Sequence, residues 1–200
     1  MKKVIVPLNQ SLSFFPSHTL EIEIYKWANT AYHPKVEIDL CHNNERLKLK
    51  IIAYENEVTI KEYADNGRIW CDSCVEFFMK PYTDDARYIN FEINPIGAMI
   101  MSIGEGRESR KPLVFEYKES LNMITHQNAN NWTAQFEIPF TMLSQIFENK
   151  KILGSGDTIK GNFYKCGDET PSQHFGMWNE IEGSVVSFHL PDYFGELYLE

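Results

Sequence analysis

Short runs in which apolar and polar residues alternate one by one dominate this 200-residue sequence. Side chains on a β-strand point alternately to its two faces, so this alternation predicts strands with one packed face and one polar face. Gly, Pro, Asn and Asp separate the runs, as turn residues do between strands. The segments with this pattern are 18–27, 35–42, 46–54, 69–79, 87–97, 112–120, 131–140, 159–167, 185–191 and 195–200.

The sequence predicts almost no helix beside these strands. One short helix is expected over residues 141–149, with Thr141 as its N-cap and apolar residues at helical spacing. About ten strands and one short helix are typical of an all-β protein, namely an antiparallel two-sheet β-sandwich of the jelly-roll or immunoglobulin-like type. The long polar stretches 55–68 and 104–112 are expected to be loops, so residues 1–200 are predicted to form a single domain.

Charge and hydropathy narrow the classes of partner. The formal net charge of −9 argues against nucleic acid, because phosphate binding needs clustered Lys and Arg. No apolar run reaches the roughly 18 residues of a membrane span, and the N-terminal apolar run is shorter than the about 7–15 residues of a signal peptide. We therefore expect neither a nucleic-acid nor a membrane partner. The chain as written is expected to be cytoplasmic, or exported if a signal has been removed, and its oligomeric state stays open.

The stretch WCDSCVEFFMKP at residues 70–81 joins an aromatic residue, two carboxylates and a Cys-x-x-Cys spacing. If the whole stretch is a strand, Val75, Phe77 and Met79 face the core, together with Cys71 and Ser73. The opposite face then carries Trp70, Asp72, Cys74, Glu76 and Phe78. Cys71 and Cys74 would point to opposite sides, which disfavours a disulfide or zinc pair between them. The four cysteines of the chain are expected to be free thiols.

The next predicted strand repeats the pattern, with Glu92 and Asn94 on its polar face. Residues 80–86 are short enough for a hairpin, so the two strands should be antiparallel neighbours. One sheet face would then hold Trp70, Asp72, Glu76, Glu92 and Asn94. Sugar rings need such a surface, since carboxylates and amides bind their hydroxyls and aromatic planes pack on their C–H faces. The alternative is an ordinary solvated sheet face.

This strand pair resembles the carbohydrate-binding module family 9-like domains, which are DOMON-like β-sandwiches. The resemblance continues in family order through YINFEINPIGAM, NWTAQFEIPFTML, GNFYKC and FHLPDYFGELYLE, and it covers residues 69–200; residues 27–51 look like the family's early strands. It implies an antiparallel sandwich that binds glucan or xylan chain ends and short oligosaccharides without catalysis, holding a sugar ring between two tryptophans. It also implies a structural calcium ion in some members.

Carried over by position, the resemblance implies roles for individual residues. Trp70 matches the first stacking tryptophan approximately, Glu76 a hydrogen-bonding glutamate and Asn94 a hydrogen-bonding asparagine. This sequence departs from the family at four further positions: Glu92 stands at an arginine position, Tyr164 at a glutamine position, Phe188 at the second stacking tryptophan and Val185 at an asparagine that precedes it. Trp178 could supply the missing plane from a loop, or it could be a structural anchor, and Phe188 could belong to the core. His189, beside Phe188, is a further candidate, although such histidines are more often structural.

Two other functions stay open at this stage. Glu76 and Glu92 could lie about 5 Å apart across the strand ladder, which suits a glycoside hydrolase, whereas Asp72 and Glu76 would be about 13 Å apart along one strand. A non-catalytic protein-interaction domain is the third hypothesis. For calcium, residues 83–86 and 167–169 are the candidate loops, although neither matches a calcium-loop pattern. No other cofactor is expected.

Overall fold

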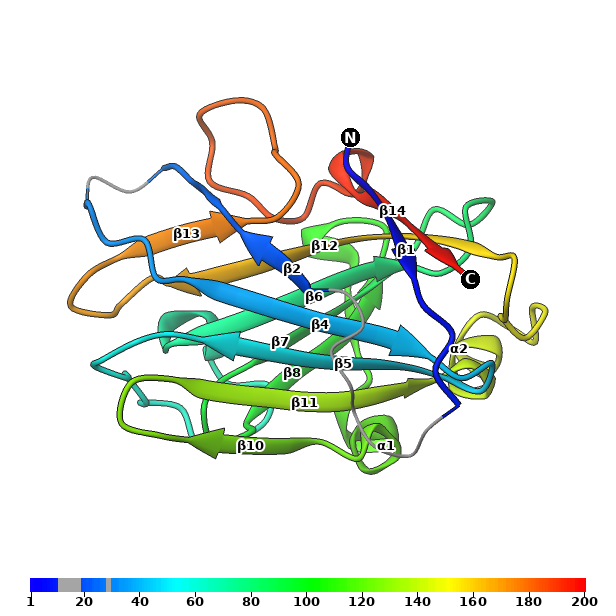
Figure 1. Ribbon diagram of the computed structural model, residues 1–200, viewed down its shortest axis with the longest axis horizontal. Helices are drawn as coiled ribbons and strands as arrows, with labels where there is room; N and C mark the ends of the chain where they lie inside the picture. Colours follow the sequence, from blue (N-terminus) through cyan, green and yellow to red (C-terminus); the bar gives the residue numbers. More distant parts are fainter. Residues whose placement is uncertain (11–18, 28–29) are drawn as a thin grey trace.

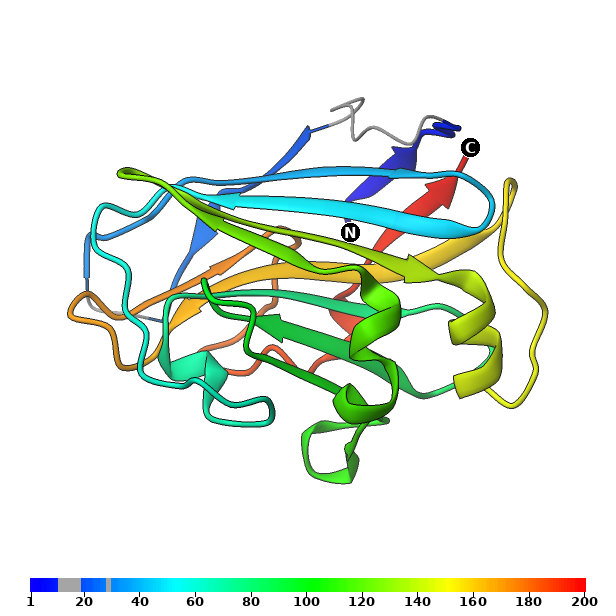
Figure 2. The ribbon, with the colours of Figure 1, turned by 90° about the horizontal axis from the view of Figure 1, so that it is seen from below.

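Two β-sheets stacked face to face make up the protein, as Figures 1 and 2 show. The structure is a computed structural model, and it describes residues 1–10, 19–27 and 30–200. The fourteen strands of these residues confirm the predicted all-β sandwich, with more and shorter strands than the alternation indicated. The start of the predicted strand 18–27 lies outside the described residues.

The larger sheet, here called sheet A, has nine strands. Its neighbours are antiparallel except for β1 and β14, which run parallel. Its main path in spatial order is β1 (Lys3–Val6), β14 (Gly195–Leu199), β12 (Thr158–Gly167), β6 (Cys74–Lys80), β7 (Tyr88–Ile93), β8 (Met99–Gly104) and β9 (Lys111–Pro112). Off this path, β13 (His174–Met177) pairs with β12, and β3 (Ile24–Tyr25) pairs with β13.

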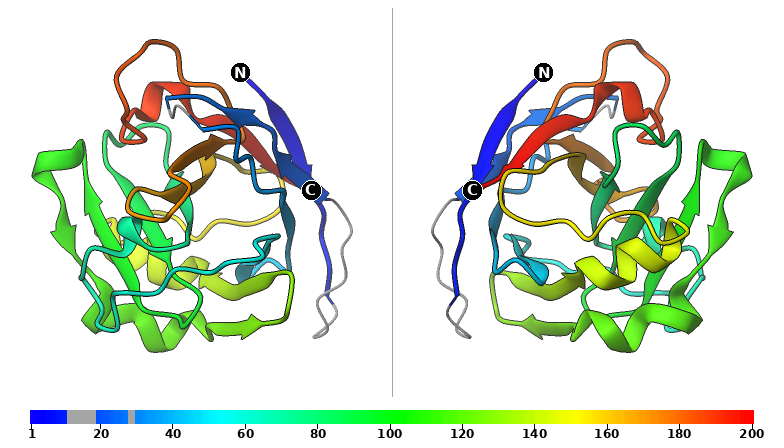
Figure 3. Two further views of the ribbon diagram at one scale, coloured as in Figure 1. Left: turned by 90° about the vertical axis from the view of Figure 1, so that its left-hand side faces the viewer. Right: turned by 90° about the vertical axis from the view of Figure 1, so that its right-hand side faces the viewer.

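The smaller sheet, sheet B, covers one face of sheet A, and the described helical segments are short. Sheet B has the antiparallel order β10 (Ile124–Gln127), β11 (Trp132–Pro139), β5 (Arg46–Ala53), β4 (Val36–His42) and β2 (Thr19–Ile22). The α-helices are α1 (Val114–Tyr117) and α2 (Phe140–Ile146), and Figure 3 shows both from the ends of the sandwich. The 3₁₀ turns are Ile69–Cys71, Arg107–Ser109, Lys118–Leu121 and Pro191–Tyr193.

The main hydrophobic core lies between the two sheets, and a smaller one lies on the outer face of sheet A. Val75, Phe77 and Met79 of β6 point into the main core, as predicted, and Phe77 stacks on Phe163 with ring centroids 4.6 Å apart. The alternate residues Cys74 and Phe78 belong to the smaller core, which the segment 178–194 covers. Both faces of β6 are therefore buried, although only one of them is packed mainly by aliphatic and aromatic groups.

Two predicted strands do not exist, and the reason differs between them. The segment 112–120 contains α1 and most of the 3₁₀ turn that follows it. Val114 and Leu121 are buried and stand seven residues apart, which is helical spacing, whereas Phe115 is 81% exposed. The segment 185–191 is an irregular loop in which the Leu190 N–H donates to the Phe188 carbonyl at 2.9 Å. β-Branched and aromatic residues alone do not make a strand where no partner strand is adjacent.

Three smaller expectations are also corrected. The predicted strand 69–79 starts only at Cys74, because Ile69–Cys71 is a 3₁₀ turn. The argument that a continuous strand separates Cys71 from Cys74 is therefore wrong; the structure joins none of the four cysteines in a disulfide. Helix α2 begins at Phe140 after an N-cap at Pro139, so Thr141 is not the cap. Within the described residues, no helix reaches the length and apolarity needed to cross a lipid bilayer.

Candidate functional site

A cavity opens on the outer face of sheet A, above its central strands β12, β6 and β7. Tyr164, Glu76 and Glu92 face one another in a row across these three strands, which confirms the predicted pairing of Glu76 with Glu92. The residues that line the cavity come from these strands and from the segments that cover them: Trp70, Glu76, Glu92, Arg107, Arg110, Cys166, Asp168, Phe175, Val186, Ser187, Phe188 and His189.

The two glutamates form the floor of the cavity, and their surroundings differ. Each is only 3% exposed, and this burial raises the pKa of Glu92 to about 7 and the pKa of Glu76 well above its usual range. Glu92 accepts a hydrogen bond from the Asn90 amide at 2.9 Å and faces the Arg110 guanidinium at 3.4 Å. Glu76 instead accepts from the Cys166 thiol at 2.9 Å. One carboxyl thus faces a cation, whereas the other accepts a hydrogen bond from a thiol and burial favours its neutral form.

Two aromatic side chains line the cavity from different segments. Phe188 stacks on Tyr164 with centroids 4.1 Å apart and an interplanar angle of 12°, and the Tyr164 hydroxyl donates to the Phe188 carbonyl at 3.1 Å. Trp70 lies on the 3₁₀ turn before β6, and its carbonyl accepts from the Asp168 N–H at 3.2 Å. Trp70 and Phe188 both line the cavity, but Phe188 is only 8% exposed and also belongs to the smaller core, as one of the two alternatives for this residue expected. Tyr164 is fully buried and stacks on Phe188.

Charged and polar groups complete the lining. Arg107 and Arg110 come from the loop after β8, and Asp168 follows β12. Burial raises the pKa of Asp168 to about 6. His189 is bonded to the Tyr88 hydroxyl at 2.8 Å, and burial lowers the pKa of this histidine to about 3, so its ring is neutral at pH 7. The cavity therefore offers both donors and acceptors around its aromatic residues.

Asp72 and Asn94 lie elsewhere, in a network that shapes two turns. Asp72 accepts from the backbone N–H groups of Lys61 at 2.9 Å and Glu62 at 3.1 Å, and it also accepts from the Asn94 amide at 3.0 Å. The Asn94 carbonyl oxygen in turn accepts from the Ala98 N–H at 3.0 Å. Neither residue lines the cavity, because β7 ends at Ile93 and β6 begins only at Cys74. The common sheet face predicted for Trp70 and the four polar residues is therefore smaller than expected.

Trp178 belongs to the core between the sheets and not to the cavity lining. It is 3% exposed, and its ring packs edge-on against Phe163 with centroids 6.0 Å apart. A Cβ on Gly195 would lie only 2.4 Å from the Trp178 ring, so glycine is what permits this close approach. The alternative in which Trp178 is a structural anchor describes this placement, and the prediction that it supplies a second ligand-facing plane is wrong.

The residues at the two predicted calcium loops do not fit a calcium cage. Asp84 lies 2.8 Å from the Lys150 ammonium, and Asp85 lies 2.8 Å from the Arg87 guanidinium. In the other loop, Glu169 pairs with Arg68 and Asp168 lines the cavity. Calcium needs several convergent oxygen ligands, whereas most of these carboxylates already face cations.

Several lining residues escaped prediction from the sequence: Arg107, Arg110, Cys166, Asp168 and Phe175. Arg107 and Arg110 stand in a polar loop that looks like any solvated connection. Their place in the cavity follows only from the pairing of β8 with β7, which brings the loop beside Glu92. Cys166 could have been found, since it alternates with Lys165 on a predicted strand, but its opposition to Cys74 required the register of two strands distant in sequence.

Comparison with solved structures identifies proteins of the same fold. A crystal structure of a candidate carbohydrate-binding protein from Bacteroides uniformis has a TM-score of 0.87 and 28% identity, covering 100% of this chain and 99% of that chain. A family 9 carbohydrate-binding module from Caldicellulosiruptor kristjanssonii in complex with cellotriose has a TM-score of 0.71 and 12% identity, covering 100% and 94%. The same organism's module in complex with glucose has a TM-score of 0.69 and 12% identity, covering 100% and 96%.

A search of the curated proteins found no significant match. The sequence profile described as carbohydrate-binding family 9 matches residues 8–199, which is nearly the entire chain. The chain therefore belongs to carbohydrate-binding family 9.

Proposed function

We propose that this protein binds one sugar ring, at the end of a glucan-type oligosaccharide or polysaccharide chain, in the cavity above β12, β6 and β7. Its family consists of non-catalytic carbohydrate-binding modules. The observation that carries the proposal is the Glu76–Glu92 pair on the cavity floor, flanked by Trp70 and Phe188. Modules of the same fold bind cellotriose and glucose, and these supply the first sugars to test.

The geometry suggests how a ring would be held. Trp70 and Phe188 offer apolar planes for the C–H faces of a pyranose. Glu92 is an acceptor for ring hydroxyls, Glu76 in its neutral form is both donor and acceptor, and Arg110 is a donor. Polar groups that converge on a cavity beside aromatic side chains are typical of sites that orient small ligands. Because Phe188 replaces an indole with a smaller ring, we expect weaker stacking than between two tryptophans.

The hydrolase hypothesis fits these observations less well. Two facing carboxyls of raised pKa are compatible with an acid and base pair. However, Arg110 engages Glu92, the thiol of Cys166 engages Glu76, and the family is one of binding modules. We therefore assign the glutamates to binding, and we expect no release of reducing sugar from any oligosaccharide that binds.

Calorimetry on substituted proteins tests the proposal. We expect Trp70→Ala to weaken the binding of cellotriose by about ten- to a hundred-fold, through loss of one aromatic anchor worth about 1–3 kcal/mol. Glu76→Gln keeps the shape of the side chain and should weaken binding less. Phe115→Ala is the matched control, because this aromatic residue is 81% exposed on α1 and does not line the cavity.

Two results would contradict the assignment. One is the absence of binding heat with glucose, cellotriose and xylotriose, which would remove the proposed function. The other is equal affinity of the Trp70→Ala and Phe115→Ala proteins, which would place the sugar outside this cavity.

A further inference from the structure

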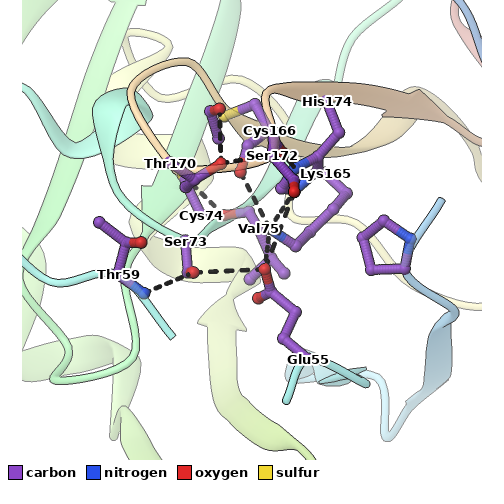
Figure 4. Close-up of polar contacts among 12 residues, drawn as sticks. Glu55, Thr59, Ser73, Cys74, Val75, Lys165, Cys166, Thr170, Ser172 and His174 are labelled. Carbon is purple, nitrogen blue, oxygen red and sulfur yellow. Dashed lines mark hydrogen bonds and ion pairs between the residues drawn. The ribbon is translucent and has the colours of Figure 1, made fainter. Parts of the chain in front are cut away.

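Three side chains with metal-binding atoms meet on the outer face of sheet A, beneath the proposed sugar cavity. Cys166 of β12 lies directly opposite Cys74 of β6, so their side chains emerge on the same face of the sheet. Glu76 is two residues beyond Cys74 on β6 and therefore shares that face. Figure 4 shows Cys74 and Cys166 next to each other on their neighbouring strands.

The distances among these groups suit a single small cation. The Cys166 sulfur lies 2.9 Å and the Cys74 sulfur 4.0 Å from the same Glu76 oxygen. All three potential ligand atoms lie within 4.8 Å of one another. Zinc bonds of about 2.3 Å to sulfur and about 2.0–2.2 Å to oxygen, in tetrahedral geometry, require ligand separations of about 3.5–3.8 Å. Small side-chain rotations would reach that arrangement.

The charge balance around Glu76 also favours a cation. Among the described residues, two other buried acids have a basic partner, Glu92 with Arg110 and Glu55 with Lys165. No ion pair with a basic side chain is found for Glu76 within the same part of the chain. A buried carboxylate without a cation is costly, so this group either holds a proton or awaits a positive charge.

We propose that Cys74, Glu76 and Cys166 bind one thiophilic divalent cation of the Zn²⁺ class. Two thiolates and one carboxylate select soft and borderline cations over calcium or magnesium. Glu76 and Cys166 both line the cavity, so the fourth coordination position faces the space where the sugar would lie. Three protein ligands with one position left for water or substrate are found in catalytic zinc sites, whereas structural zinc sites have four protein ligands. Binding forms two metal–sulfur bonds and one metal–oxygen bond, and it releases to solvent the two thiol protons together with the proton of Glu76 when that carboxyl is protonated.

The shared carboxyl predicts a consequence for sugar binding, and this consequence rests on the proposed function. A bound cation removes the proton that neutral Glu76 would donate to a ring hydroxyl and weakens its oxygens as acceptors, so each ligand should weaken the binding of the other by the same factor. The cation site itself does not depend on any sugar.

Cadmium is the probe for the site, because cadmium–thiolate bonds absorb in the ultraviolet. Reduced, untagged protein is titrated with Cd²⁺, and the charge-transfer absorbance and calorimetry give the stoichiometry and Kd. We expect one Cd²⁺ per chain, displaceable by Zn²⁺. Cys74→Ser and Cys166→Ser should each weaken binding by at least about ten-fold. Cys41→Ser and Cys71→Ser are matched controls that remove a buried free thiol elsewhere, and they should leave the Kd unchanged.

The proposal is overturned if reduced wild-type protein binds no Cd²⁺, or if all four serine variants bind it equally. It is also overturned if the purified protein proves to hold a Cys74–Cys166 disulfide in place of the cation, as intact mass without reductant would show. The titration on wild type needs no variant to fold, and circular dichroism checks each variant. Binding of Cd²⁺ without any sugar binding would refute the proposed function alone, whereas sugar binding without Cd²⁺ would refute the cation site alone.

Discussion

Glu92 carries a buried carboxyl, and Arg110 is the cation that faces it across the cavity. Replacing this arginine with methionine keeps much of the side-chain volume but leaves Glu92 without its cation. We expect Arg110→Met to weaken sugar binding by about ten-fold or more, because charge-assisted hydrogen bonds are roughly twice as strong as neutral ones. Calorimetry with cellotriose measures the effect. Lys111→Met, a loss of an exposed cation on the next residue, is the control; equal affinity in both variants would refute the role of Arg110.

The sequence predicted that Glu76 faces Glu92, but it did not predict that Arg110 contacts Glu92. The facing of Glu76 and Glu92 follows from the period of a strand and a short connection, which are local properties. Arg110 reaches Glu92 only because β8 pairs with β7 and its loop folds back over the sheet. Asp72 shows the opposite error, since it follows the alternation in the sequence but lies before the strand begins. Residues at strand ends are those for which period-two arguments fail first.

At the level of elements, the close approach of strands and turns depends on particular glycines. Gly195 starts β14 directly beside the Trp178 ring, and an added Cβ would lie 2.4 Å from that ring and 2.9 Å from the Lys2 carbonyl. We expect Gly195→Ala to lower the free energy of unfolding by about 1–3 kcal/mol, as overpacking does. Urea denaturation measures this cost. Gly106→Ala is the control, because a Cβ there meets nothing within 4 Å. Equal urea midpoints for the two variants would show that the atoms around Gly195 move aside without loss of stability.

The elements that the sequence predicted best are the long ones in the middle of each sheet. The runs at 35–42, 46–54, 131–140 and 159–167 became β4, β5, β11 and β12 because each has a partner on both sides. The segment 112–120 misled because four residues of alternation fit a helical turn equally well. The short strands β1, β8, β10 and β13 carry too little alternation to be recognised, and their positions depend on the sheet that they join.

Across the whole molecule, a buried polar cluster links the two sheets at one end of the sandwich (Figure 4). Lys165 of β12 is fully buried and lies 3.2 Å from the carboxylate of Glu55, which follows β5. Glu55 also accepts from the indole N–H of Trp132 on β11 at 2.7 Å. Such a cluster is satisfied only when both sheets are in register, so it favours one packing of the sandwich over others.

His174 on β13 belongs to this cluster and makes its stability depend on pH. The Lys165 ammonium donates to His174 Nε2 at 2.8 Å, and Nδ1 lies 2.7 Å from the Ser172 carbonyl, so the ring is neutral with its proton on Nδ1. Burial, and next the nearby Lys165 charge, lower the pKa of His174 to about 4. In the unfolded chain the pKa of a histidine is about 6.5.

Between pH 4 and pH 6.5, His174 is protonated in the unfolded chain but neutral in the folded protein. The contribution of the neutral ring to the free energy of unfolding is therefore full above about pH 6.5 and is lost as the pH falls toward 4. We expect the advantage of wild type over His174→Gln, in free energy of unfolding by urea, to shrink by about 1–2 kcal/mol from pH 7.5 to pH 4.5. The buried carboxyls near the cavity, whose pKa values are raised, act in the opposite direction, but they act alike in both proteins and cancel in the difference. His126→Gln, at an exposed histidine of β10, serves as the control. The prediction is wrong if the stability difference between wild type and His174→Gln changes with pH as little as the difference between wild type and His126→Gln. That result would show that the buried ring accepts its proton as readily as an exposed one.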